Sequence, residues 1–168
     1  MAFGDSLTEG TGAKRGFGYP QQLQDLSGYR VINAGVAGEV SSDGLARLPG
    51  LLDAHSPALV ILCHGGNDLL RKLDANQLRD NLSAMIKLIR ESGADVVLLG
   101  VPKPALLLGP ADVYIEVAEK HQVVTNLDII AKVLSRPSLK SDPVHPNAAG
   151  YRQIAEAIHA TLSEAGAL

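Results

Sequence analysis

Long apolar runs, runs of basic residues and paired cysteines are all missing from this sequence of 168 residues. With Cys63 as its one cysteine, the chain cannot form an internal disulfide. No apolar stretch approaches the ~20 residues that span a bilayer, so we expect no stable membrane insertion. The formal net charge is −3 and no Lys/Arg-rich run is present, which argues against a nucleic acid partner. The length favours a single domain over residues 1–168.

A signal peptide is not visible ahead of the first informative residues. The first predicted strand has room only for residues 1–3, because small and polar residues begin at Gly4. We therefore expect a periplasmic or secreted protein if an N-terminal signal precedes Met1 in the natural gene product, and a cytoplasmic protein otherwise.

Short apolar runs alternate with amphipathic stretches along the chain. The predicted strands cover residues 1–3, 30–34, 58–63, 95–100 and 123–127. The predicted helices cover residues 19–26, 44–54, 74–92, 111–120 and 147–165. The third of these helices has an apolar stripe formed by Leu78, Leu82, Met85, Ile86 and Ile89.

This alternation predicts an α/β protein, a three-layer α/β/α sandwich around a five-stranded parallel sheet. The runs at residues 58–63 and 96–99 are apolar without alternation, which is typical of strands covered on both faces. In such sheets, ligands bind beyond the carboxyl ends of the strands. Residues that follow the predicted strands are therefore the candidates for function.

Three of these residues could form a nucleophilic centre. Ser6 comes after the first predicted strand, and Asp142 and His145 come after a loop that follows the last one. A serine hydroxyl needs a base within hydrogen-bond reach and a third group that orients the base. An imidazole titrates near neutrality, and a carboxylate three residues earlier could hold its tautomer. We therefore interpret Ser6 as the nucleophile, His145 as the base and Asp142 as the orienting acid.

Attack by a serine on a carbonyl creates an oxyanion, which needs fixed hydrogen-bond donors. The backbone N–H of Ser6 is one candidate donor. The backbone N–H of Gly38 is a second, because glycine lets the backbone approach closely. The side-chain amide of Asn67 is a third.

These segments together resemble the SGNH hydrolases, also called the GDSL family, which are named for residues in four blocks. The blocks here are Gly-Asp-Ser-Leu at 4–7, Asn-Ala-Gly-Val-Ala-Gly at 33–38, Gly-Gly-Asn-Asp at 65–68 and Asp-Pro-Val-His-Pro at 142–146. All four occur in the family's order across nearly the whole chain. The Gly-Asp-Ser-Leu-Thr segment also differs from the Gly-x-Ser-x-Gly elbow of α/β-hydrolases.

The resemblance implies a flavodoxin-like sheet of strand order 2-1-3-4-5. It implies the triad Ser6, Asp142 and His145 and an oxyanion hole formed by Ser6, Gly38 and Asn67. More narrowly, the chain resembles the bacterial arylesterase, acyl-CoA thioesterase and lysophospholipase branch, with a small-molecule ester or thioester as substrate. It implies no metal and no other cofactor.

Several candidates also have a purely structural interpretation. Ser6 could simply cap a helix, and Asp5 and Asp68 could anchor their own turns. His64 could line the ligand crevice or be a buried, hydrogen-bonded core residue. Glu39, next to Gly38, could cap its loop or contact the substrate.

The apolar loop after the fourth predicted strand is the candidate wall for an acyl or aryl group. Its substrate-binding candidates are Leu106, Leu107 and Leu108. Because the loop is apolar rather than rich in aromatic residues, it favours acyl or aryl groups over a sugar.

The leading hypothesis is a serine esterase or thioesterase that works through an acyl-enzyme. A carbohydrate O-acetylesterase is the alternative within the same chemistry. A nonenzymatic flavodoxin-like binding module for a nucleotide is a different class, but the phosphate-binding glycine motifs are missing. A metal-dependent hydrolase would have to use His64 and Asp68, which have no convincing third ligand.

Overall fold

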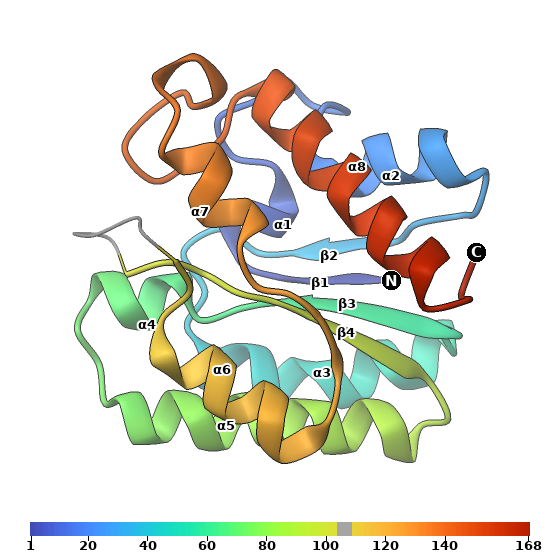
Figure 1. The fold of residues 1–168 in the computed structure, drawn as a ribbon. Coiled ribbons are helices and arrows are strands. Elements are labelled where there is room, and N and C mark those ends of the chain that lie inside the picture. The colour runs from blue at the N-terminus through green and yellow to red at the C-terminus, as the bar shows by residue number, and fades with distance from the viewer. Residues whose placement is uncertain (104–108) are drawn as a thin grey trace.

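The computed structural model describes residues 1–103 and 109–168. Figure 1 shows three layers, in which α2 and α8 cover one face of a central sheet and α3, α5 and α6 cover the other. The helices are α1 (Ser6–Glu9), α2 (Tyr19–Ser27), α3 (Ser41–His55), α4 (Gly66–Leu70), α5 (Ala75–Glu91), α6 (Asp112–His121), α7 (Ile129–Leu134), the 3₁₀ turn η1 (Pro137–Leu139) and α8 (Ala148–Glu164).

The sheet has five parallel strands in the order β2-β1-β3-β4-β5. They are β1 (Ala2–Gly4), β2 (Asn33–Gly35), β3 (Leu59–Cys63), β4 (Asp95–Leu99) and β5 (Val124–Asn126). The three-layer architecture and the strand order predicted from the sequence are both confirmed.

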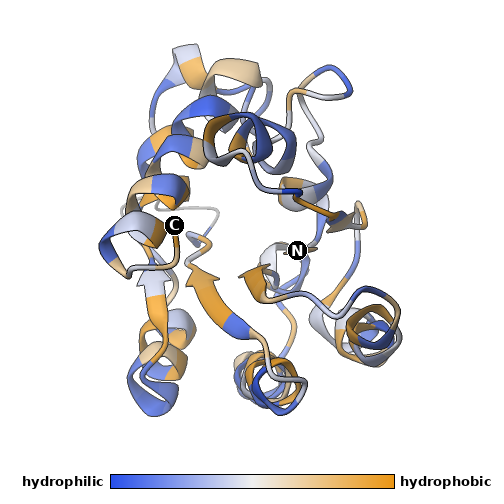
Figure 2. Cartoon of the chain, turned by 90° about the vertical axis from the view of Figure 1, so that its right-hand side faces the viewer, coloured by the Kyte–Doolittle hydropathy of each residue, from blue (hydrophilic) through white to orange (hydrophobic). Residues whose placement is uncertain are grey.

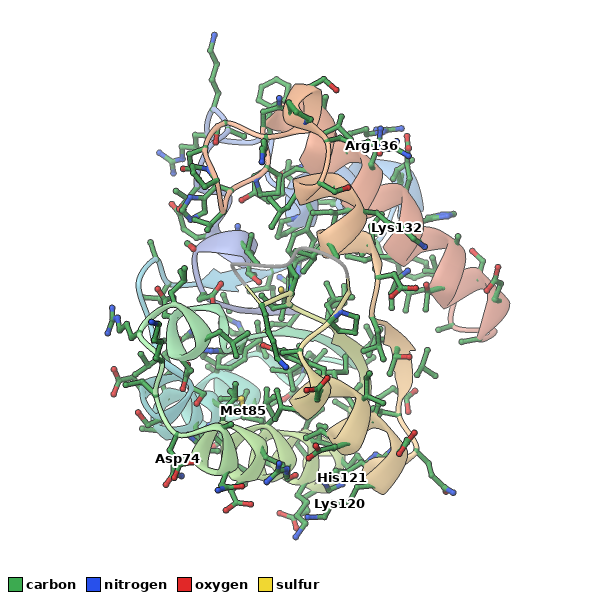
Figure 3. The ribbon with its side chains drawn as sticks, turned by 60° about the vertical axis from the view of Figure 1, so that its left-hand side comes forward. Asp74, Met85, Lys120, His121, Lys132 and Arg136 are labelled. Carbon is green, nitrogen blue, oxygen red and sulfur yellow. The ribbon has the colours of Figure 1, made fainter. Side chains whose placement is uncertain are left out.

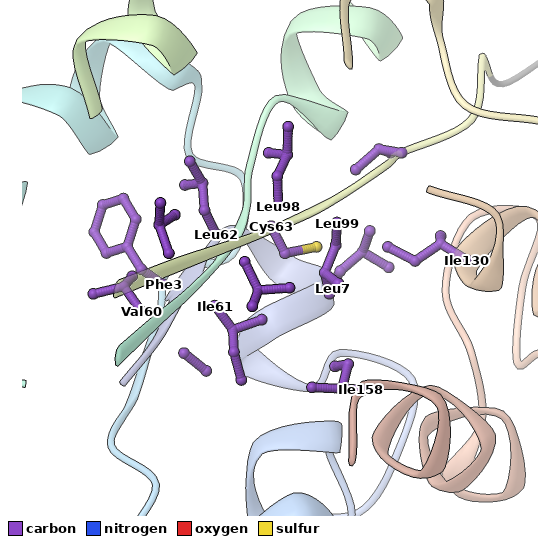
Figure 4. Close-up of a cluster of buried hydrophobic side chains, with 14 of the residues drawn as sticks. Phe3, Leu7, Val60, Ile61, Leu62, Cys63, Leu98, Leu99, Ile130 and Ile158 are labelled. Atoms are coloured by element: carbon purple, nitrogen blue, oxygen red, sulfur yellow. The ribbon is translucent and has the colours of Figure 1, made fainter. Parts of the chain in front are cut away.

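The core lies on both faces of β3 and β4, the two strands with continuous apolar runs. Val60, Leu62 and Cys63 of β3 and Leu98 of β4 are fully buried, and Figure 4 shows them clustered around these strands with Phe3 of β1. Figure 2 shows the same division by hydropathy, with apolar strands between helices whose polar residues lie on the outside. Burial of both faces explains why these strands do not alternate in the sequence.

Helix α5 has the boundaries that its pattern predicts to within one residue. Asp74 caps it by accepting a hydrogen bond from the Asn76 N–H at 2.8 Å. All five residues of the predicted apolar stripe are buried. Figure 3 shows Asp74 at the start of the helix and Met85 within it, far from Lys132 and Arg136 on the other side of the sheet.

The predictions miss the short elements. Helices α1, α4 and α7 and the turn η1 have three to six residues each, which is too short for a helical period to show in the sequence. The predicted strand at 30–34 is β2, which begins only at Asn33. Helix α3 begins at Ser41, three residues before the prediction, and continues through Pro49.

Candidate active site

Ser6 and His145 lie within hydrogen-bond distance at the carboxyl edge of the sheet. Ser6 is the first residue of α1, directly after β1, and His145 lies in the loop that leads into α8. The His145 Nε2 atom is 3.0 Å from the Ser6 Oγ atom. On the other side of the ring, His145 Nδ1 is 2.7 Å from Asp142 Oδ2. The structure thus places the three residues in one chain of hydrogen bonds.

The loop at 140–147 holds the imidazole through the carboxylate of Asp142. Its Oδ1 atom accepts hydrogen bonds from the N–H groups of Val144 at 2.8 Å and His145 at 2.9 Å. Burial works to raise the pKa of Asp142, but these bonds and the His145 ring outweigh it and hold that pKa below its usual value. Asp142 therefore stays ionised beside the ring.

Ser6 is not the cap of its helix. That role belongs to Asp5, whose Oδ1 atom accepts from the Leu7 N–H at 3.1 Å. The Oδ2 atom of Asp5 accepts from the Gly66 N–H at 3.1 Å, which ties α1 to the start of α4. Burial raises the pKa of this carboxyl group. The Ser6 hydroxyl is left to face His145.

Two of the three predicted oxyanion donors, Gly38 and Asn67, lie on segments that are hydrogen-bonded to each other. We call residues 36–39 the oxyanion loop; in it Gly38 has a φ of +80°, a conformation that favours glycine. The Asn67 Nδ2 atom donates to the Glu39 carbonyl at 2.9 Å, and Arg71 donates to the Gly38 carbonyl at 2.8 Å. Within residues 1–103 and 109–168, the N–H groups of Ser6 and Gly38 have no hydrogen-bond acceptor.

A small cavity, partly open to solvent, lies beside the serine. Its apolar lining comes from several elements and consists of Leu7, Leu70, Val101, Pro102, Leu134 and Val144. Ser6, Asn67 and His145 lie on its polar side. The predicted wall residues Leu106, Leu107 and Leu108 lie outside the described residues, but Val101 and Pro102 at the start of the same loop do line the cavity.

Glu39, a substrate-binding candidate in the sequence, has internal partners for its side chain. Its side chain is buried, with Oε1 2.6 Å from Arg47 Nε and Oε2 3.0 Å from His64 Nε2. Burial works to raise the pKa of Glu39, but the hydrogen bonds from Arg47 and His64 outweigh it, so the pKa is lowered. Both carboxylate oxygens are therefore hydrogen-bonded inside the protein, and Glu39 is not among the residues that line the cavity beside Ser6.

His64 and Asp68 also have internal partners. His64 is fully buried and bonded to Glu39, so it is a core residue and not a wall of the crevice. Asp68 accepts from both the backbone N–H and the hydroxyl of Ser41, at 2.8 and 2.6 Å. Among the described residues, no cluster of three or more histidine, cysteine or acidic side chains could hold a metal ion.

Arg47 is the residue near the site that the sequence analysis missed. Its guanidinium reaches from α3 to the ends of β1 and β2, where it donates to the carbonyls of Gly4 and Ala34. The spacing in the sequence could have identified it. Arg47 lies three residues after Gly44 and one before Leu48, and both of these residues are on the buried face of α3. A cation on that face of a helix needs a buried partner.

Comparison with known proteins agrees with the four blocks. The chain is 34% identical over 168 residues to an arylesterase of Vibrio mimicus, covering 93% of this chain and 84% of that one. It is 30% identical over 155 residues to the thioesterase 1/protease 1/lysophospholipase L1 of Escherichia coli, covering 88% and 74%. The crystal structure of TesA has a TM-score of 0.87 and 32% identity and covers 97% of both chains.

The match to a family model extends over most of the chain. The model described as the GDSL-like lipase/acylhydrolase family matches residues 2–153, a range that contains all four blocks. The chain therefore belongs to the GDSL-like lipase/acylhydrolase family, the SGNH hydrolases, and is an enzyme of that family.

Proposed function

We propose that this enzyme hydrolyses carboxylic esters and thioesters through Ser6, His145 and Asp142. The observation that carries the proposal is the hydrogen-bond chain from Ser6 Oγ through His145 to Asp142, with lengths of 3.0 and 2.7 Å. Both distances fall in the range expected of a nucleophile, a base and the group that orients the base.

The reaction follows from this geometry in two steps. Ser6 attacks the acyl carbonyl while His145 Nε2 takes its proton, and the collapsing tetrahedral intermediate releases the alcohol or thiol, which receives that proton. Water then attacks the acyl-enzyme by the same route and frees the carboxylic acid and Ser6. Asp142 stabilises the imidazolium in both steps. The N–H groups of Ser6 and Gly38 and the amide of Asn67 serve as donors to the oxyanion.

The lining of the cavity supports an acyl or aryl group as the part of the substrate that is recognised. Val101, Pro102 and Leu134 present apolar surface beside Ser6. Burial of apolar substrate surface there contributes about 25 cal/mol per Å². The printed names of the relatives, arylesterase and thioesterase 1/lysophospholipase L1, support the same substrate class.

Labelling with a fluorophosphonate probe and turnover of a short p-nitrophenyl ester test the proposal. The parent protein should label and turn over, and Ser6→Ala should do neither. Asp5 caps α1, so the substitution leaves the helix start intact. Ser163→Ala, which changes an exposed serine on α8, is the matched control and should behave like the parent. Turnover retained in Ser6→Ala would refute the mechanism.

A substrate panel tests the acyl class. Aryl esters, acyl-CoA thioesters and lysophospholipids should be cleaved in preference to acetylated xylan, because the described lining beside Ser6 is apolar. Preference for acetyl-xylan would instead favour the carbohydrate O-acetylesterase. The panel should be repeated with a strong chelator, which should leave the rates unchanged.

A further inference from the structure

A cluster of buried Glu39 and His64 with partly buried Arg47 lies next to the oxyanion loop, and no step of the proposed reaction uses it. We propose that this anchoring cluster, Glu39, Arg47 and His64, positions the oxyanion loop and Asn67 relative to Ser6. The inference deepens the proposed function and rests on it. These three are positioning residues, since none of them lines the cavity beside the serine.

Arg47 connects the first two catalytic blocks through one side chain. Its Nη2 atom is 3.1 Å from the Gly4 carbonyl and 2.9 Å from the Ala34 carbonyl, at the ends of β1 and β2. Gly4 lies two residues before Ser6, and Ala34 leads into the oxyanion loop. The guanidinium also stacks on the ring of Phe3, 4.3 Å from its centroid, which fixes its plane.

Glu39 binds the same guanidinium through two hydrogen bonds. Arg47 Nε is 2.6 Å from Oε1 and Arg47 Nη2 is 2.7 Å from Oε2. Such a bidentate pair restricts both distance and orientation. Because this carboxylate belongs to the last residue of the oxyanion loop, the pair fixes that end of the loop to α3.

His64 brings the third block into the cluster. Its Nδ1 atom accepts from the Gly65 N–H at 2.9 Å, so the ring proton lies on Nε2, which donates to Glu39 Oε2 at 3.0 Å. The His64 carbonyl accepts from the Tyr114 hydroxyl at 2.8 Å. Both ring nitrogens are therefore hydrogen-bonded, and the backbone of the same residue is tied to Tyr114 of α6.

The main chain of Glu39 connects the anchoring cluster to two oxyanion donors, Gly38 and Asn67. While its side chain is held by Arg47 and His64, its carbonyl accepts the Asn67 Nδ2 hydrogen at 2.9 Å. Gly38 is bonded covalently to the same residue. The position of Glu39 thus sets where the Gly38 N–H lies and how the Asn67 amide is turned.

The expected effect is on the rate of the chemical step. Loss of one oxyanion donor costs about 10²–10³ in kcat, and a misplacement of about 1 Å can cost 10²-fold. Interactions made only in the transition state change kcat more than KM. If the cluster merely stabilised the fold, its substitution would lower the melting temperature without lowering kcat more than it changes KM.

Two variants test the proposal at a temperature where each is fully folded by circular dichroism. Glu39→Gln keeps the side-chain size but turns an NH₂ group toward Arg47 or His64. Arg47→Lys keeps the charge but cannot reproduce the bidentate pair. Each should lower kcat about 10- to 100-fold, with KM changed less than about threefold, and should slow fluorophosphonate labelling in parallel.

The matched control is Glu116→Gln, which makes the same chemical change in an exposed ion pair with Arg79. It should leave kcat, KM and the labelling rate at parent values. Folded variants of the anchoring cluster with kcat within about twofold of the parent would overturn the proposal, as would failure of both to fold. Ser6→Ala distinguishes failure of the positioning role from failure of the proposed function, because turnover in that variant would refute the proposed function itself.

Discussion

Replacing Asp142 by asparagine should reverse the tautomer of His145. The asparagine carbonyl oxygen is required at the Oδ1 position, where the N–H groups of Val144 and His145 both donate. The NH₂ group then takes the Oδ2 position, 2.7 Å from His145 Nδ1, and donates to it. The ring proton moves to Nε2, which faces the Ser6 hydroxyl at 3.0 Å and can no longer accept its proton.

The structure sets the part of this effect that comes from the tautomer. To restore the working tautomer, the amide must flip and lose two backbone hydrogen bonds, each worth about 0.5–1.5 kcal/mol. That cost of about 1–3 kcal/mol lowers the rate about 5- to 150-fold at 1.36 kcal/mol per decade. Loss of the negative charge beside the imidazolium adds to it. We expect kcat to fall about 10³- to 10⁴-fold, as in other triads.

Initial rates on a short p-nitrophenyl ester at neutral pH measure the effect, with Asp142→Ala as the comparison. The Asp142 side chain is 43% exposed, so water can enter the alanine variant and accept from Nδ1–H. Alanine should therefore retain more activity than asparagine, although it loses the turn that both backbone bonds stabilise. An asparagine variant that is more active than the alanine variant, or within about fivefold of the parent, would refute the tautomer reasoning.

Three further predictions concern stability, measured as the free energy of unfolding in urea. Gly44→Ala should destabilise and lower kcat, because its methyl group would collide with His64 Nε2, whereas Gly50→Ala on the same helix meets nothing and should stabilise by about 0.5–1 kcal/mol. Leu82→Ala should cost about 2–5 kcal/mol, because that side chain is fully buried. Burial and neighbouring cations lower the pKa of His121. His121 therefore binds a proton more tightly in the unfolded chain than in the folded chain. The stability that His121 contributes is present above about pH 6.5 and is lost below it. His121→Gln should reduce that loss on acidification; a decline as steep as the parent's would contradict it.

The fold was accessible from the sequence because its longest elements carry unambiguous patterns. The continuous runs that became β3 and β4 are typical of strands buried on both faces, and the stripe on α5 is typical of an amphipathic helix. The order of the strands came from the resemblance to the SGNH hydrolases. Helices α1 and α4 were missed because their few residues are determined by side-chain contacts, as in the bond between Asp5 and Gly66.

The candidate site divides in the same way. Ser6, Asp142 and His145 could be named from their residue types and their places after strands. The bonds that join them could not, since Ser6 and His145 are 139 residues apart in the chain. The ion pair of Glu39 was hidden for the same reason, because a carboxylate in the oxyanion loop has no visible partner in the sequence until α3 places Arg47 against it.

By itself, then, the sequence determined the layers of the fold, the four blocks and the chemical types available at the carboxyl edge of the sheet. Local periodicity and residue type are encoded along the chain, and these conclusions need nothing else. Only the tertiary structure decided which donor meets which acceptor. Hydrogen bonds and buried ion pairs depend on separations of about 3 Å between residues that are distant in sequence, and those separations exist only once the sheet has brought the ends of its strands together.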